Sequence, residues 1–107
     1  MISVNIQRNE KGRICGYTVT DHGETDICAA VSLLTLNTAN SIETFTDEDI
    51  TYDYDPKGGF LKLELPLVIE GQDNPQVDLL LEAMVLGLKS VKENYSDEIE
   101  LKDEVSI

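Results

Sequence analysis

Apolar and polar side chains alternate along the first twenty residues, with one interruption. In residues 2–8 every second position is apolar, which is typical of a strand with one buried face. The alternation returns in residues 13–20, where Cys15, Tyr17 and Val19 share a face. Because the segment between them (Asn-Glu-Lys-Gly) consists of turn-forming residues, the pattern predicts a β-hairpin.

At Asp26 the apolar period changes from two to about 3.6 residues, which predicts a helix that ends near Thr44. Thr25 or Asp26 is expected to cap it, since a short side-chain oxygen can accept a free amide of the first turn. A second helix is predicted from Pro75, a residue favoured in the first turn. The apolar positions are Ile27, Val31, Leu34, Thr38, Ile42 and Phe45 in the first helix, and Val77, Leu81, Met84, Leu88, Val91 and Tyr95 in the second.

The remaining segments complete an α+β pattern. Residues 50–54 and 59–65 are predicted to be strands joined by a tight connection, and a last strand is predicted from Glu98 to about Val105. Residues 66–74 are expected to form a loop. The order β-β-α-β-β-α-β predicts two layers, with a mostly antiparallel sheet and two helices packed on it. We expect a single domain over residues 1–107.

The charge of the chain excludes some partners. Its 21 acidic and 8 basic side chains give a net charge of −13. This balance argues against direct binding of DNA or RNA, which requires cations against phosphates. It fits plain solubility or attraction to a basic partner. Since no apolar run can span a membrane and the first residues lack a signal-peptide layout, we expect a cytoplasmic protein without a membrane partner.

The two cysteines, Cys15 and Cys28, are expected to be reduced thiols in that compartment. Neither belongs to a CxxC motif, so zinc-ribbon and thioredoxin interpretations lack support. One Cys, one His and nearby carboxylates fall short of a closed structural zinc site, and we expect no metal and no cofactor. Cys15 shares a strand face with Tyr17 and Val19, which favours a place in the core.

Residues suited to nucleophilic catalysis gather near the start of the first predicted helix. Cys28 lies in the opening turn, where unpaired amides and the helix dipole favour a thiolate. His22, the only histidine, precedes it by a short loop, and a neutral imidazole is the usual partner of a cysteine nucleophile. Ser32 lies one turn beyond Cys28 on the same face, and Asp26 or Glu24 is placed to orient the histidine.

The pattern alone leaves blander interpretations open. A lone cysteine at a helix start is more often a small buried hydrophobe than a nucleophile. A lone histidine beside a loop is more often a surface residue. These signals by themselves do not decide between catalysis and packing.

The segment also resembles a known signature. His22, a short Gly-containing loop and the helix start Cys-Ala-Ala-Val-Ser at residues 28–32 resemble the ribosomal-processing cysteine protease (Prp) family, in which a Gly-His-Ala turn precedes an acidic residue and a Cys-Ala-x-x-Ser helix start. Asp21 and Gly23 stand in place of the usual Gly and Ala, and the stretch from His22 to Cys28 is shorter than in typical members. The resemblance continues through residues 33–41, 58–63 and 83–89, and so covers nearly the whole chain.

This resemblance implies a bacterial cysteine endopeptidase that removes the N-terminal extension of a large-subunit ribosomal protein, cutting after an aromatic residue. It implies Cys28 as nucleophile and His22 as base, with Ser32 at the family's helix serine. The family's acidic position corresponds to Asp26, shifted by one place, or is held by Thr25 and has no acidic residue. The implied partners are a ribosomal protein precursor with a basic N-terminal extension and a second copy in a homodimer. The alternative is a non-catalytic acidic dimeric module that binds a ribosomal or other basic protein, which the short loop favours.

Overall fold

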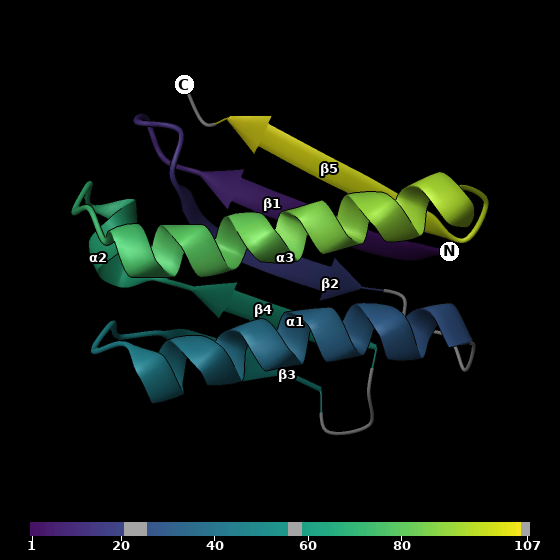
Figure 1. The fold of residues 1–107 in the computed structure, drawn as a ribbon, viewed down its shortest axis with the longest axis horizontal. Coiled ribbons are helices and arrows are strands. Elements are labelled where there is room, and N and C mark those ends of the chain that lie inside the picture. Colours follow the sequence, from purple (N-terminus) through teal and green to yellow (C-terminus); the bar gives the residue numbers. More distant parts are fainter. Residues whose placement is uncertain (21–25, 56–58, 106–107) are drawn as a thin grey trace.

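The computed structural model describes residues 1–20, 26–55 and 59–105, and its elements follow the predicted order (Figure 1). The predicted boundaries of the strands differ from the observed ones by at most one residue. The elements are β1 (Ile2–Arg8), β2 (Ile14–Thr20), α1 (Asp26–Phe45), β3 (Thr51–Tyr54), β4 (Phe60–Glu64), α2 (Pro66–Ile69), α3 (Pro75–Asn94) and β5 (Ile99–Val105).

The strands of the described ranges form one sheet in the order β3-β4-β2-β1-β5. β1 with β2, β2 with β4 and β3 with β4 are antiparallel, whereas β1 and β5 are parallel. Parallel neighbours need a long connection, and here nearly the whole chain lies between β1 and β5. The predicted α+β class with a mostly antiparallel sheet is confirmed.

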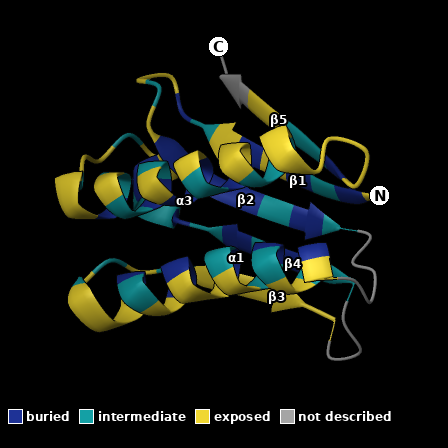
Figure 2. Cartoon of the chain, turned by 45° about the vertical axis from the view of Figure 1, so that its right-hand side comes forward, coloured by how far each residue is buried: buried dark blue, intermediate teal, exposed yellow. Residues whose placement is uncertain are grey.

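The two long helices, α1 and α3, lie side by side and antiparallel on one face of the sheet (Figure 1). They approach closely at Gly87, because a Cβ there would lie 3.0 Å from the Cδ2 atom of Leu34. The core fills the space between helices and sheet, as the buried strand and helix surfaces in Figure 2 show. Its largest fully buried side chains are Tyr17, Ile14, Ile42, Leu63, Leu65, Leu81, Leu88, Ile99, Val4, Val19, Val31 and Val77.

Two predictions about local structure are wrong. Residues 66–74, predicted as a loop, begin with the short helix α2, which has Pro66 in its first turn. Four helical residues are too few to produce a period in the sequence. Phe45 and Tyr95, predicted as members of the apolar stripes, are 73% and 48% exposed, because each stands at the C-terminal end of its helix, past the last buried turn.

A buried hydrogen bond fixes α1 to the sheet. The Tyr17 hydroxyl donates to the carbonyl oxygen of Thr35 at 2.7 Å, and neither residue is exposed. Burial raises the pKa of Tyr17 far above its ordinary value, so the phenol remains a protonated donor. Together with the packing of the buried face of α1, this bond fixes the height and rotation of α1 above β2.

Arg8 ties β1 to β5 and to α3. Its guanidinium donates to Asp103 at 2.7 and 2.9 Å and to Glu82 at 2.9 and 3.0 Å. Two carboxylates thus share one planar fork of donors, the geometry that gives Arg its strongest ion pairs. The hydrogen bonds from Arg8 lower the pKa of Asp103 below its ordinary value.

We expect Arg8→Met to lower the free energy of unfolding at pH 7 by about 2 kcal/mol, because hydrogen bonds to charged groups contribute more than neutral ones. Lys62→Met is the matched control. The Lys62–Glu64 pair spans 3.5 Å with side chains 40% and 36% exposed, and such pairs contribute at most about 1 kcal/mol. Urea denaturation measures both changes, and an equal loss in the two variants would contradict this role of Arg8.

The same network predicts an acid dependence of stability. Because the pKa of Asp103 is lower in the folded chain than in the unfolded chain, its contribution is fully present above the unfolded value. The contribution is lost as the pH falls through the folded value. Denaturation curves of Asp103→Asn should therefore show a shallower loss of stability below about pH 4 than those of the parent chain.

Candidate functional site

The end of β2 and the start of α1, between which the sequence predicts the catalytic site, lie at the same end of the sheet. β2 ends at Thr20, and α1 begins at Asp26 above the same end. Because β4 is antiparallel to β2 and β3 is antiparallel to β4, β3 also ends there (Figure 1). The register sets Thr20 beside Phe60, and Tyr54 beside the next residue of β4. We take this end of the sheet as the candidate active site.

Cys28 lies in the first turn of α1, half-buried, with its side chain packed against the core. Ser32 follows one turn later on the same flank of the helix and is also half-buried. Asp26 is exposed and lies two residues before Cys28, so it faces a different side of the helix. His22 and Glu24 lie outside the described residues, and the pairing of imidazole with thiol stays a prediction.

Of the two residues predicted to cap α1, the structure describes one. Asp26 is the first residue of the helix and adds a carboxylate to its first turn. An acidic side chain there interacts favourably with the positive end of the helix dipole. Thr25, the other capping candidate, lies outside the described residues.

The first turn of α1 is suited to negative charge. The first amides of a helix have no partner within the helix, and they point toward its N-terminal end. A thiolate on Cys28 and an oxyanion on a substrate carbonyl both gain from such donors. The position of Cys28 is therefore one at which sulfur can act as a nucleophile.

Cys15 is the contrasting thiol. It lies near the start of β2, away from α1's first turn, at a bulge where β2 has one more residue than β1. It is 6% exposed, and its Sγ lies 3.6 Å from the carbonyl oxygen of Gln7. Burial raises the pKa of the Cys15 thiol, which disfavours the thiolate. The prediction that Cys15 is a core residue is confirmed.

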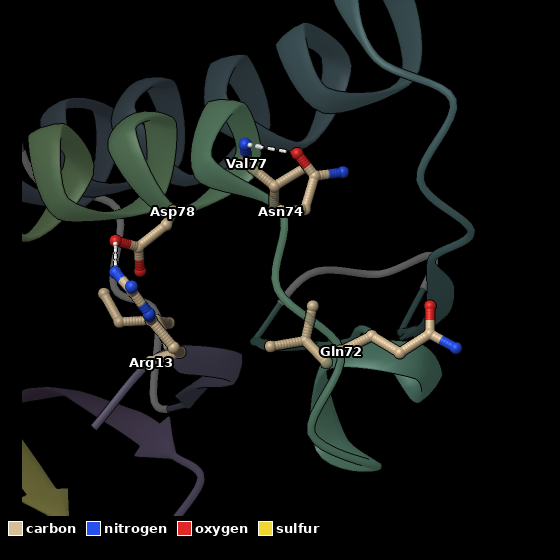
Figure 3. Close-up of a pocket in the computed structure, with 7 residues that line it drawn as sticks. Arg13, Gln72, Asn74, Val77 and Asp78 are labelled. Carbon is tan, nitrogen blue, oxygen red and sulfur yellow. Dashed lines mark hydrogen bonds and ion pairs between the residues drawn. The ribbon is translucent and has the colours of Figure 1, made fainter. Parts of the chain in front are cut away.

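A small pocket lies at the other end of the sheet, where β2 and α3 begin (Figure 3). Within it, Arg13 pairs with Asp78 at 2.9 Å, and the Asn74 side chain caps α3 by accepting from the amide of Val77. Its cavity volume is about 10 Å³, roughly the room of one water molecule. The pocket is too small for a peptide. Its lining residues are Arg13, Ile14, Val68, Gln72, Asn74, Val77 and Asp78.

Within residues 1–20, 26–55 and 59–105, no three His, Cys, Asp or Glu side chains lie together in a way that could hold a metal ion. No helix of these ranges is long and apolar enough to cross a membrane.

Comparison with known proteins bears directly on this site. A family model described as "Cysteine protease Prp" matches residues 1–100, which include β2, the start of α1 and β3. The chain belongs to the cysteine protease Prp family. The resemblance predicted from residues 22–32 is thereby confirmed.

Individual Prp proteins are similar along almost their full length. The "Ribosomal processing cysteine protease Prp" of Staphylococcus aureus is 28% identical over 107 residues, covering 94% of this chain and 97% of the relative. The protein of the same name from Bacillus subtilis is 23% identical over 105 residues, covering 92% and 94%.

Solved structures share the fold. The Prp of S. aureus in complex with a covalently linked product peptide has a TM-score of 0.87 and 26% identity, covering 97% of this chain and 100% of that one. SMU.848 from Streptococcus mutans has a TM-score of 0.86 and 28% identity, covering 99% and 96%. The arrangement of α1, α3 and the sheet is therefore that of solved Prp structures.

Sequence reasoning missed the relation between α1 and β3. On this edge strand Tyr52 and Tyr54 are 36% and 62% exposed. Burial and the nearby carboxylate of Glu43 on α1 raise the pKa of Tyr52. No sequence signal links these residues, because only the strand order of the sheet brings β3 under α1.

The two thiols are expected to differ in reactivity. Iodoacetamide near neutral pH should alkylate Cys28 at least about tenfold faster than Cys15, because Cys15 is buried and its thiolate is disfavoured. Peptide mapping at timed intervals gives the two rates. In urea the rates should converge, which controls for intrinsic differences. Equal rates in the folded chain would contradict the assignment of Cys28 as the accessible thiol.

Proposed function

We propose that the chain is a cysteine endopeptidase that removes the N-terminal extension of a large-subunit ribosomal protein, with Cys28 as nucleophile and His22 as base. One observation carries the proposal. Within a chain whose residues 1–100 match a cysteine protease family, Cys28 stands half-buried in the first turn of α1, whereas Cys15 is sealed in the core. The names of the similar proteins, which describe ribosomal processing and a covalently linked peptide, support the same activity.

The chemistry follows from the residue types. His22 takes the proton of Cys28, and the thiolate attacks the carbonyl carbon of the peptide bond. Main-chain amides at the start of α1 donate to the oxyanion, and each such donor contributes about 3 kcal/mol to transition-state stabilisation. The imidazolium then returns its proton to the leaving amine. Water, deprotonated by His22, hydrolyses the thioester and frees the sulfur.

The supporting residues have separate roles in this proposal. Ser32, one turn below Cys28, is placed to hold the sulfur in position by a hydrogen bond. Asp26 keeps negative charge beside the helix start and is the candidate to orient the protonated imidazole, as a third group does in a triad. Residues 1–107 act as one protease domain in the cytoplasm, where the ribosomal protein precursor with its basic N-terminal extension is found.

Cys28→Ala and His22→Ala are each expected to lower cleavage of the host's own precursor by at least about a thousandfold, since nucleophile and base act as one unit. Mass spectrometry of the product measures the loss of the extension. Cys15→Ala is the matched control, and it should retain cleavage if the chain stays folded. Wild-type cleavage by Cys28→Ala would overturn the nucleophile assignment. Tight binding of the precursor by the parent chain without any cleavage would favour the non-catalytic binding module.

We also propose that the chain forms a homodimer. Large apolar side chains are exposed on the outer surface of the helical layer, where solvent contact is costly. α1 carries only two charged residues, Asp26 and Glu43, in a chain with a net charge of −13, so repulsion between copies is weak there. The exposed leucines of this surface are Leu33, Leu36, Leu79 and Leu86.

Sedimentation equilibrium should therefore give twice the chain mass of 11.9 kDa. Replacing Leu33 and Leu86 by lysine should shift the chain to a monomer. These side chains are 70% and 68% exposed in the single chain, and the proposed dimer interface would bury them. Circular dichroism checks that the variant stays folded. A parent chain that sediments as a monomer at all concentrations would refute the dimer.

A further inference from the structure

β3 leaves main-chain groups free for pairing. Among the described residues it forms an edge of the sheet and pairs only with β4. The amide of Asp55 donates to the carbonyl of Phe60 at 3.1 Å, so the main chain of Asp55 points toward the neighbouring strand. In an antiparallel pair the residues of a strand point their main-chain groups alternately toward and away from the neighbouring strand. Tyr54 and Tyr52, one and three residues before Asp55, therefore direct their N–H and C=O groups away from β4. An extended peptide can pair with such groups as an added strand.

The charged side chains around this edge are mostly acidic. From Ile14 to Pro56 the sequence contains no Lys or Arg. Lys62 lies opposite Asp53 on the neighbouring strand, and its ammonium pairs with Glu64 at 3.5 Å. Four carboxylates around β3 are exposed and form no ion pair with any described residue: Glu43, Asp47, Asp49 and Asp53.

The opposite edge of the sheet has a different character. On β5, Lys102 pairs with Glu100 at 3.2 Å. The ammonium of Lys92 on α3 donates to the carbonyl of Ile99 at 3.2 Å. The charges at this edge are therefore mixed and partly neutralised, whereas the β3 edge is complementary to a positively charged strand.

The β3 edge is also on the side of α1 that carries the candidate nucleophile. Cys28, Ser32, Ala39 and Glu43 are spaced by four, seven and four residues, so they lie along one flank of α1. Burial and the carboxylate of Glu43 raise the pKa of Tyr52, which indicates that Glu43 lies near Tyr52. The flank that carries Cys28 therefore faces β3. β3 itself runs toward the end of the sheet where α1 begins (Figure 1).

We propose that the β3 edge binds the basic segment of the substrate as an added β-strand and leads the peptide to Cys28. This inference rests on the proposed function, which supplies the basic precursor. Main-chain pairing with Tyr52 and Tyr54 gives affinity for an extended chain, and Asp49 and Asp53 select Lys or Arg side chains. A second copy of this chain fits the edge poorly, because pairing would bring identical carboxylates together.

The backbone part of the proposal is tested on the Cys28→Ala background, so that the peptide is bound but not consumed. The probe is a fluorescent synthetic peptide that spans the junction between the extension and the mature sequence of the host's precursor. Tyr54→Pro removes one outward amide without removing a ladder bond, and Tyr54→Ala is the matched control that keeps the amide. We expect Tyr54→Pro to bind at least about fivefold more weakly than Tyr54→Ala. Equal affinities overturn the added strand.

The charge part is tested with Asp49→Asn/Asp53→Asn against the control Glu93→Gln/Asp97→Asn, which removes the same charge from exposed positions on α3 and the turn before β5. At low salt the β3 variant should bind about fivefold more weakly than the control, and the difference should vanish near 0.5 M salt. A peptide with every Lys and Arg replaced by Gln should not distinguish the variants. Equal binding by both variants overturns the charge selection.

These outcomes separate the docking surface from the proposed function. Weakened binding in the β3 variants, in a parent chain that cleaves nothing, supports the docking surface and refutes the protease. Cleavage of the precursor with an unchanged KM in the β3 variants keeps the protease and overturns the docking surface. Aggregation or a changed oligomeric state in these variants, with peptide affinity unchanged, also overturns the docking surface. That result would show that the acidic side chains only prevent the edge strand from pairing with other chains.

Discussion

The hydrogen bond between the Tyr17 hydroxyl and the Thr35 carbonyl holds α1 in one orientation above the sheet. The Tyr17 hydroxyl is sealed from water, so leaving it without a partner would cost more than the bond itself contributes. The position of Cys28 depends on this constraint. A helix turns by about 100° per residue, and a rotation of one residue would move Cys28 off the flank that faces β3.

The places of the two cysteines in the fold explain why their thiols differ in exposure. β2 begins at a bulge that carries Cys15 into the core, and it ends below the first turn of α1, where Cys28 stands half-buried. One strand thus separates an inert thiol from an accessible one. The positive end of the helix dipole acts on Cys28 and not on Cys15, because its effect falls off beyond the first turn. The fold therefore distinguishes the two thiols, and Cys28 is the one that the proposed function uses as nucleophile.

The sequence predicted most strands and both long helices correctly, but it did not predict which strands lie next to each other in the sheet. Alternation and helical periods located the strands and the long helices, because a half-buried face repeats along each of them. The helix α2 was missed because a single turn has no period. The parallel pairing of β1 with β5 and the edge position of β3 depend on contacts between distant segments, which no local pattern encodes. For the same reason the sequence indicated Cys28 and Ser32 but not that Glu43, on the same flank of α1, lies near Tyr52 of β3.

In the proposed reaction Cys28 forms a covalent intermediate with the peptide. This step is tested most directly with a peptide chloromethyl ketone whose sequence ends at the cleavage site of the host's precursor, followed by intact mass and peptide mapping. We expect one adduct per chain, located on Cys28, and a much slower reaction when His22 is replaced by alanine. An adduct on Cys15, or full cleavage of the precursor by chains already modified at Cys28, would contradict it.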